Sequence, residues 1–248
     1  MERSGNNHGG YHGQTIAIQS VLRQIQQAAA RNHWAPDPDF PAFLRPNDAA
    51  RARVYISTGI HGDEPAGPLA ALQLLQEDSW PKAAAFWLCP CLNPAGFALN
   101  RRENGQGMDL NRDYRHLQSP EVRAHVDWLQ RQPPFDLSLC LHEDWEAAGF
   151  YVYELNPDNK PSFAEKIIAA AATACPIDPS PVIEGRPAQN GIIRPNLNPA
   201  ERPQWPEAFY LITHKTRLSY TLEAPSDFLL EARVAALVAA VRAVLAAL

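Results

Sequence analysis

Short apolar runs with the length of β-strands alternate along this chain with segments in which apolar residues recur at helical spacing. The strand-like runs cover residues 53–59, 85–91, 136–142, 149–155 and 217–223. The helical segments cover residues 15–31, 65–77, about 120–131, 162–174 and a stretch from about residue 227 onward. This alternation predicts an α/β fold, with a twisted, mostly parallel or mixed sheet covered by helices on both faces.

One helix start is marked by three consecutive residues. Ser119 suits the N-cap position, Pro120 suits the first helical position, and Glu121 places an acid in the first turn. We therefore expect a helix that begins at residue 120 and ends near residue 131.

The length of 248 residues favours a single domain spanning residues 1–248, with 46% hydrophobic and 20% charged residues. The net charge is −5, and no run of Lys and Arg could follow a phosphate backbone. Nucleic acid is therefore not an expected partner.

The first thirteen residues, MERSGNNHGGYHG, are polar and rich in glycine, and we expect this N-terminus to be flexible. They lack the apolar core of a signal peptide. No stretch reaches the roughly 18 apolar residues that would span a membrane. The sequence thus predicts a cytoplasmic protein without a membrane partner.

The four cysteines do not form a disulfide-type framework in a chain of this length. Cys89 and Cys91 lie in the apolar run FWLCPC, and Cys140 lies in LSLCL. The spacing of a structural zinc site is absent. We expect all four to be small, buried core residues.

The 23 prolines are densest between Pro176 and Pro206. This spacing predicts a long irregular region. A loop of that length in a compact domain is usually functional, so we expect a wall of a binding site there. A disordered flap is the alternative.

Polar residues follow three of the strand-like runs, at the edge where such sheets bind ligands. His61 and Glu64 follow the first run, and His142 ends another. Each alone also fits a structural role, such as helix capping or a hydrogen bond at a strand end. Together they offer two imidazoles and one carboxylate without a fourth protein ligand, which suits a catalytic zinc with a position open for water.

Glu223 closes the apolar run SYTLE, where an acid is an unusual core residue. Its carboxylate could accept a proton from an activated water molecule. The alternative is a cap on the C-terminal helix, although Ser226 or Asp227 fits that role better.

The segment LNRRENGQGMDLNRDY contains Arg102 on a loop and Asn111 and Arg112 after Asp109. The guanidinium group is a planar fork that matches a carboxylate through two hydrogen bonds. One arginine could therefore hold the free carboxylate of a substrate while the other polarises the scissile carbonyl.

The order HGDE, NPAG, RRENGQGMDLNR, LHE and TLE resembles the zinc carboxypeptidase family, from about residue 52 to 240. The first and third of these motifs are most similar to small bacterial members that act on murein peptides. The resemblance implies a mixed α/β sheet of about eight strands and one zinc ion.

The resemblance also implies a role for each motif residue. It makes His61, Glu64 and His142 the zinc ligands, and Asp109 the carboxylate that orients a ligand histidine. It makes Asn111 and Arg112 the grip on the substrate's terminal carboxylate, Arg102 the oxyanion stabiliser and Glu223 the general base. For the family's active-site tyrosine, Tyr210 is the nearest candidate, with Tyr151 and Tyr153 as further possibilities.

These features predict a zinc-dependent metallocarboxypeptidase that hydrolyses an amide bond next to a free carboxylate in a small peptide. The first alternative is an N-acyl amino acid deacylase resembling aspartoacylase or succinylglutamate desuccinylase. The second is a non-catalytic peptide-binding module, which would not need Glu223 or Arg102. His and carboxylate ligands also accept other divalent metals.

Overall fold

The computed structural model describes residues 14–198 and 201–248, so the N-terminal segment expected to be flexible lies outside the described residues. The helices are α1 (Ile18–Arg31), α2 (Ala66–Glu77), α3 (Pro94–Leu99), the short 3-10 helix η1 (Leu110–Arg112), α4 (Pro120–Arg131), α5 (Ala164–Ala171), α6 (Glu207–His214) and α7 (Leu230–Leu245). The strands are β1 (Ala35–Pro36), β2 (Phe43–Arg45), β3 (Ala52–Thr58), β4 (Ala84–Cys89), β5 (Leu137–Asp144), β6 (Tyr151–Leu155), β7 (Val182–Ile183), β8 (Arg186–Gln189), β9 (Ile192–Ile193) and β10 (Ser219–Pro225).

The described strands form one mixed sheet in the order β1-β2-β4-β3-β5-β10-β6-β9-β8-β7. The four central strands, β4, β3, β5 and β10, run parallel to one another, and β2 and β6 flank them in the antiparallel direction. The sheet therefore has ten strands, and the expected number of eight is wrong. Three of the ten, β1, β7 and β9, are only two residues long, too short to produce a periodic pattern.

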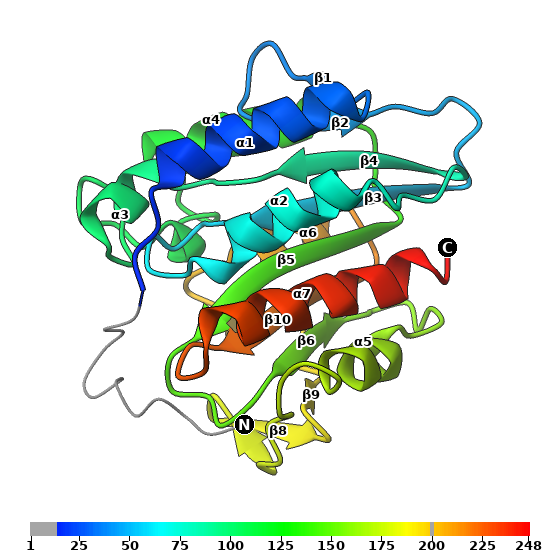
Figure 1. Ribbon diagram of the computed structural model, residues 1–248. Coiled ribbons are helices and arrows are strands. Elements are labelled where there is room, and N and C mark those ends of the chain that lie inside the picture. The colour runs from blue at the N-terminus through cyan, green and yellow to red at the C-terminus, as the bar shows by residue number, and fades with distance from the viewer. Residues whose placement is uncertain (1–13, 199–200) are drawn as a thin grey trace.

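Helices cover both faces of this sheet, as expected (Figure 1). Helices α1, α2, α5 and α7 cover one face, and α4 and α6 cover the other. Because both faces are covered, the central strands are buried along most of their length, and successive residues point to opposite cores. On β4, for example, Phe86 belongs to the core under α1 and α2, while Trp87 belongs to the core under α4.

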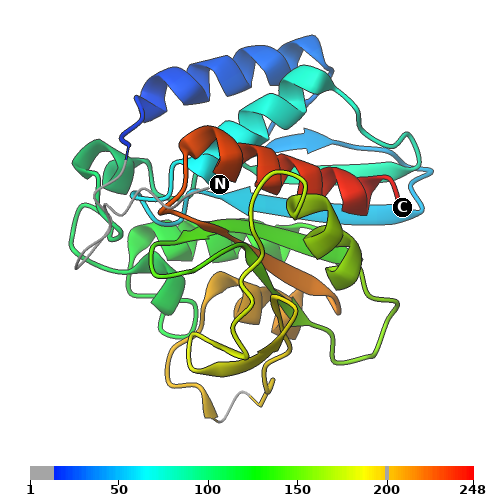
Figure 2. The same cartoon turned by 60° about the horizontal axis from the view of Figure 1, so that its bottom comes forward.

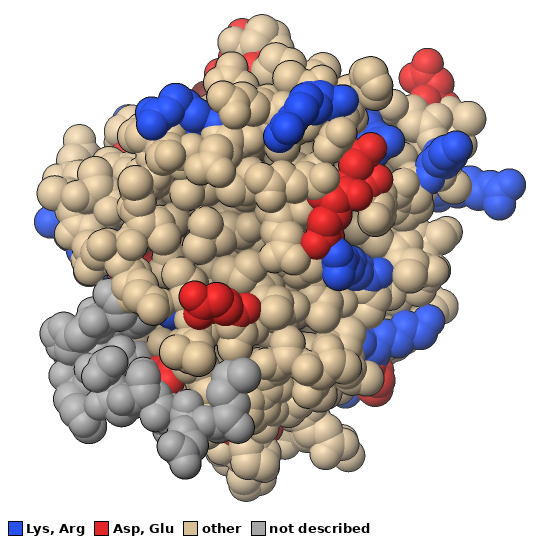
Figure 3. All heavy atoms as spheres, in the orientation of Figure 1, with Lys and Arg blue, Asp and Glu red and all other residues tan. Residues whose placement is uncertain are grey.

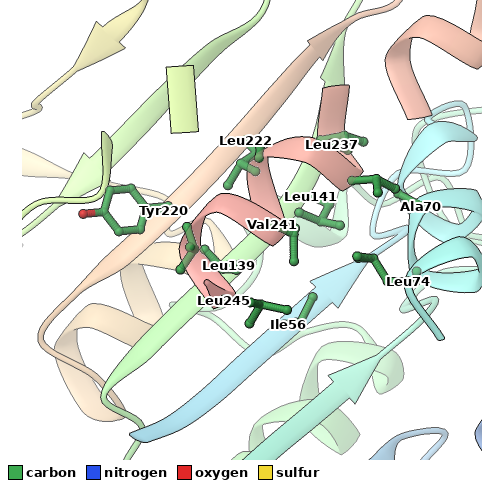
Figure 4. Close-up of a cluster of buried hydrophobic side chains, with 14 of the residues drawn as sticks. Ile56, Ala70, Leu74, Leu139, Leu141, Tyr220, Leu222, Leu237, Val241 and Leu245 are labelled. Carbon is green, nitrogen blue, oxygen red and sulfur yellow. The ribbon is translucent and has the colours of Figure 1, made fainter. Parts of the chain in front are cut away.

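The larger core lies between the central strands and helices α2 and α7 (Figure 4). Leu139 and Leu141 of β5 contribute to it, together with Leu222 of β10 and Val241 of α7. These side chains are at most 1% exposed. Each such burial stabilises the fold by roughly 1.5–3 kcal/mol, so this core fixes the positions of the strand ends that carry the site.

Most expected elements appear near their expected bounds. Ser119 caps α4, because its hydroxyl accepts a hydrogen bond from the Val122 N–H at 3.3 Å. Helix α7 starts at Leu230 rather than near residue 227, and no side chain caps it. All four cysteines are buried and free, as expected.

The proline-rich segment is less irregular than expected, because it contains β7, β8 and β9. It then leads into α6, a helix that the sequence did not predict. Figure 2 brings this part of the chain, coloured yellow to orange, to the lower front of the molecule.

Charged side chains are scattered over the face that carries α1, α2 and α7 (Figure 3). On this face, Lys and Arg side chains do not gather into a basic patch. Among the described residues, no helix is both long enough and apolar enough to cross a membrane.

Candidate metal centre and active site

The loop after β3 carries the first two candidate ligands. Gly59 has a φ of +63°, a conformation that glycine adopts without strain. A Cβ on Gly62 would lie 2.0 Å from the carbonyl carbon of Gly96, so only glycine fits where this loop meets α3. The resulting tight turn holds His61 and Glu64 at the carboxyl end of β3, just before α2.

The alternation of side chains along the strands brings the other site residues to the same place. On β5, Leu139 and Leu141 point toward α2 and α7, so His142 points to the opposite face. On β10, Leu222 points toward α7, and Glu223 therefore points to that same opposite face. The backbones of His142 and Glu223 are direct neighbours in the parallel β5–β10 pair.

His61, Glu64 and His142 form a compact, buried group whose donor atoms all lie within 4.8 Å of one another. Their exposed fractions are 2%, 5% and 4%. His142 Nδ1 lies 3.0 Å from Glu64 Oε2, and His61 Nδ1 contacts Glu64 Oε1. Two imidazole nitrogens and a carboxylate with one open side match the donor set of a catalytic zinc.

The electrostatics favour an ionised Glu64 and a neutral His142, the protonation states that a metal needs. Burial alone would raise the pKa of Glu64, but the two neighbouring histidines outweigh it and lower that pKa, so the carboxylate stays ionised. Burial lowers the pKa of His142, which favours the neutral imidazole. For His61, burial lowers the pKa, but the charge of Glu64 and the hydrogen bonds with Asp109 and Glu64 together outweigh it, so the pKa is raised.

Asp109 contacts two residues of the site, His61 and Arg102. Its Oδ1 lies 3.3 Å from His61 Nε2, an arrangement that assigns the Nε2 proton to this contact and leaves Nδ1 as the donor to a metal. Its Oδ2 accepts a hydrogen bond of 2.8 Å from Arg102 Nε. Burial would raise the pKa of Asp109, but His61 and Arg102 outweigh it and the pKa is lowered.

These residues open onto one cavity of about 580 Å³. Arg102, Asn111, Arg112 and Glu223 line it together with the three candidate ligands. Burial, followed by the charges of Glu64 and Asp144, raises the pKa of Glu223 well above its ordinary value. A raised pKa makes the ionised carboxylate a stronger base.

Asn111 and Arg112 lie on η1, at the side of the cavity. Asn111 Oδ1 accepts a hydrogen bond of 2.8 Å from the Glu207 N–H at the start of α6. This bond orients the amide so that its NH₂ group remains to donate to a ligand. Arg112 is exposed, and its Nη1 donates to the backbone oxygen of Asn111 at 2.9 Å.

The structure does not bring Tyr210 into this cavity. Its ring is buried on α6, with ring centroids 5.9 Å from Tyr114 and 4.7 Å from His214. Tyr151 and Tyr153 line the cavity instead, because both lie on the same face of β6. The Tyr151 hydroxyl donates to Asp144 Oδ2 at 3.0 Å.

Several cavity residues did not emerge from the sequence motifs. Their side chains are charged, and most lie in the proline-rich segment or just after β5: Asp144, Glu146, Glu184, Arg186, Glu201 and Arg202. The proline density predicted that this segment forms a wall of a binding site. It did not predict which charged residues would face the cavity.

Glu143 follows the candidate ligand His142 in the sequence but has a structural role. Glu143 points away from the cavity floor toward α2 and α7, and its Oε1 accepts a hydrogen bond of 2.5 Å from the Ala66 N–H. Its Oε2 contacts Arg233 and accepts a hydrogen bond of 3.1 Å from the Ser226 hydroxyl. Glu143 therefore ties the start of α2 and the start of α7 to β5.

Comparison with solved structures supports the fold assignment. A candidate metallopeptidase from Shewanella amazonensis has a TM-score of 0.79 at 24% identity, with 92% of this chain and 91% of that chain covered. A metallo-carboxypeptidase from Pseudomonas aeruginosa, in complex with (2-guanidinoethylmercapto)succinic acid, has a TM-score of 0.67 at 19% identity, with 94% and 70% covered. The fold is therefore metallocarboxypeptidase-like, as the motifs predict.

Comparison of sequences gives two further relationships. Carboxypeptidase SOL1 from Arabidopsis thaliana is 32% identical over 124 residues, which is 42% of this chain but only a quarter (25%) of that protein's length. Residues 50–182 match the succinylglutamate desuccinylase/aspartoacylase catalytic domain. Because this match covers more than half of the chain, the protein belongs to the succinylglutamate desuccinylase/aspartoacylase catalytic-domain family.

Proposed function

We propose that this protein is a zinc-dependent hydrolase that cleaves an amide bond next to a free carboxylate, as metallocarboxypeptidases do. One observation carries the proposal. The buried group of His61, Glu64 and His142 opens onto the same cavity as Glu223 and Arg112. A metal site, a general base and a carboxylate grip in one cavity are the parts that this reaction needs.

His61, Glu64 and His142 would hold the metal. When bound, a zinc ion would lower the pKa of a water molecule toward about 7 and polarise the scissile carbonyl. Glu223 would take the proton of the attacking water and later give it to the leaving amine. Its raised pKa suits both transfers, because the group must first accept a proton and then release it.

Arg102 and Arg112 would each contact a different negatively charged group of the substrate. Arg102 is held through Nε by Asp109, and its Nη1 lies 3.6 Å from Glu64 Oε1, so its guanidinium group would lie beside the metal and stabilise the carbonyl oxygen as negative charge develops there. Arg112 has no ion pair within the described parts of the chain, and with Asn111 it would hold the free carboxylate.

The acid-over-amide preference of the protein tests this proposal. Zinc-loaded protein should hydrolyse peptides with a free C-terminus and discriminate strongly against the same peptides with an amidated C-terminus. Arg112→Lys should raise KM more than it lowers kcat, because the bond to the carboxylate exists in both ground and transition states. Equal hydrolysis of acid and amide peptides would contradict the carboxypeptidase assignment.

A deacylase acting on N-acyl amino acids is the second candidate, and the family match supports it. Such substrates also carry a carboxylate next to the scissile amide, so the two functions differ mainly in the size of the acyl group. The cavity of about 580 Å³ lies within the roughly 300–1,000 Å³ of pockets that hold drug-sized ligands, so it has room for a short peptide. Turnover of N-acetyl amino acids against tripeptides of the same C-terminal residue would separate the two functions.

A further inference from the structure

A buried carboxylate beside the cavity has no part in the reaction proposed above. Glu207 is the first residue of α6 and is 1% exposed. Pro206 and Ala208, its two neighbours in the chain, both line the cavity. Burying a carboxylate is costly unless hydrogen bonds compensate for the lost water, so this residue must be held by specific partners.

Two hydroxyl groups of β3 hold this carboxylate. The Tyr55 hydroxyl donates to Glu207 Oε1 at 2.7 Å, and the Ser57 hydroxyl donates to Oε2 at 2.9 Å. Tyr55 and Ser57 lie on the same face of a central strand, and both are at most 1% exposed. The two bonds therefore fasten the start of α6 to the strand that leads into the loop with His61.

The Tyr55 hydroxyl also connects Glu207 to the segment that follows η1. It lies 2.9 Å from His125 Nε2, and the Tyr114 hydroxyl lies 2.6 Å from His125 Nδ1. Burial lowers the pKa of His125 to about 3, so its ring is neutral and carries one proton. When Tyr55 donates to Glu207, His125 must donate to Tyr55 from Nε2 and accept from Tyr114 at Nδ1. This chain of bonds joins Glu207 to Tyr114, which comes shortly after Arg112.

The backbone of Glu207 contacts a residue of the candidate substrate site. Its N–H lies at the beginning of a helix, where the helix itself offers no acceptor, and it donates to Asn111 Oδ1 at 2.8 Å. Because a backbone N–H can only donate, it fixes the amide with its oxygen toward α6 and leaves the NH₂ group to donate elsewhere. Asn111 is 8% exposed and lines the cavity with Arg112. A shift of the start of α6 would therefore change the orientation of this amide.

We propose that Glu207 is a positioning residue for recognition of the substrate's carboxylate. Its side chain, anchored on Tyr55 and Ser57, fixes the backbone N–H that orients Asn111. The inference rests on the proposed hydrolase function and deepens it. Glu207 does not line the cavity, so its effect on the substrate should pass through Asn111.

The double variant Tyr55→Phe/Ser57→Ala removes both donors and keeps Glu207. For a free-acid peptide such as N-acetyl-Ala-Ala, KM should rise about tenfold, the order expected for two lost hydrogen bonds. The value of kcat should change less than about threefold, because the grip on the carboxylate exists in both ground and transition states. Turnover of the amidated peptide, which has no carboxylate to hold, should stay within about twofold, so the acid-over-amide preference should fall.

Tyr55→Phe alone is a milder change that keeps the comparison available if the double variant does not fold, and it should raise KM about threefold. Tyr220→Phe is the matched control. Tyr220 is also a buried tyrosine of a central strand, and its hydroxyl donates to the buried Glu154 at 2.8 Å, but it belongs to the core under α7. Its loss should lower the stability in the same way while KM and the acid-over-amide preference stay unchanged.

A double-mutant cycle with Asn111 separates positioning from a general loosening of the fold. Asn111→Ala alone should raise KM and reduce the acid-over-amide preference. Adding Tyr55→Phe/Ser57→Ala should then raise KM by less than about twofold more, because the path through Asn111 is already lost. A further increase of about tenfold in this background would overturn the inference, since Glu207 would then act by another route.

Calorimetry separates this inference from the proposed function. Zinc-loaded Glu223→Gln protein should bind N-acetyl-Ala-Ala more tightly than its amide. Adding Tyr55→Phe/Ser57→Ala should weaken binding of the acid about tenfold and leave binding of the amide within about twofold.

The outcomes of these measurements differ for the two proposals. If the binding preference is present and reduced in this way, although the wild type hydrolyses no peptide, the hydrolase proposal fails and the positioning role stands. If the wild type hydrolyses acid peptides preferentially but the Tyr55 and Ser57 changes leave KM and the preference unaltered, the positioning role is overturned and the hydrolase proposal stands. Equal binding of acid and amide by the Glu223→Gln protein would also overturn the positioning role.

Discussion

Glu223 illustrates how one residue acquires its function from its neighbours. It lies beside His142 in the sheet and faces a cavity rather than a hydrophobic core. Burial is the largest influence on its raised pKa, and the charges of Glu64 and Asp144 add to it. A carboxylate on the opposite face of β10, toward α7, would lie among leucine side chains. It would have no water molecule there from which to take a proton.

Replacing Glu223 with Gln should therefore separate metal binding from catalysis. The amide keeps the shape of the side chain but cannot accept the proton of the water, so kcat should fall by roughly 100-fold or more. Zinc content, measured by elemental analysis, should stay near that of the wild type. Loss of zinc in this variant would show that Glu223 is a ligand or a structural residue.

At the residue scale, the motifs predicted the positions that share one cavity, but not the orientation of every side chain. His61, Glu64, His142 and Glu223 each follow an apolar run, and that pattern alone places them at one edge of a sheet. Tyr210 was misplaced because the turn of α6 that buries its ring carries no clear sequence signal. Arg186 and Arg202 depend on the path of the proline-rich segment, which local pattern does not determine.

At the scale of elements, the carboxyl end of β5 is held in place by a buried ion pair. Glu143 contacts Arg233 of α7 and caps the first N–H of α2. Both side chains are nearly inaccessible, with exposed fractions of 5% and 1%. The pair thus connects three elements around the candidate metal ligands.

Glu143→Ala should destabilise the protein by roughly 3–5 kcal/mol, the usual result of removing one partner of a buried ion pair. Glu143→Gln should cost less, because its amide oxygen can still accept from the Ala66 N–H. Urea unfolding should show the loss as a lower midpoint with an unchanged slope. A loss below about 1 kcal/mol for Glu143→Ala would mean that the contact with Arg233 contributes little.

A second buried carboxylate joins α6 to β3. Glu207 accepts hydrogen bonds from the Tyr55 hydroxyl at 2.7 Å and the Ser57 hydroxyl at 2.9 Å. Its backbone N–H is the donor that orients Asn111. Burial is the main cause that raises the pKa of Glu207 from 4.5 to about 7, and the two hydroxyl groups oppose it.

This raised pKa predicts a pH-dependent stability in the metal-free protein. The folded state holds the Glu207 proton more tightly than the unfolded state, so the stability is fully present below pH 4.5 and falls as the pH rises toward about 7. The loss amounts to on the order of 3 kcal/mol. Glu207→Gln removes the titration, so its stability relative to wild type should improve between pH 5 and pH 8.

The control for this experiment is Glu231→Gln, at an exposed position of α7. Its stability relative to wild type should be the same at both pH values. Chemical unfolding of all three proteins at pH 5 and pH 8 gives the comparison. An unchanged difference between Glu207→Gln and wild type would mean that Glu207 is ionised throughout this range.

At this scale the sequence predicted the long elements and missed the short ones. The runs that became β3, β5 and β10 are buried along most of their length and mostly apolar, and such runs are easily recognised. Strands β1, β7 and β9 are pairs of residues whose conformation depends on a neighbouring strand. Helix α6 is eight residues long and follows a proline, so its pattern spans barely two turns.

At the scale of the whole molecule, the candidate metal site joins distant parts of the chain. His61 and Glu64 precede α2, whereas His142 lies near the end of β5, about eighty residues later. The parallel pairing of β3 with β5 brings these segments together in the folded protein. The unfolded chain has no such juxtaposition, so a metal that uses all three ligands binds the folded state alone.

Zinc should therefore stabilise the whole fold by mass action. At a free zinc concentration of one hundred times Kd, the free energy of unfolding should rise by about 2.7 kcal/mol. For a chain of this size that corresponds to an increase in Tm of roughly 5–10 °C. Differential scanning calorimetry should show the increase with zinc and its reversal with a chelator. His142→Ala should unfold at a Tm that zinc no longer changes, because two ligands from one loop do not link β3 to β5. A full zinc-dependent increase in that variant would place the metal elsewhere on the protein.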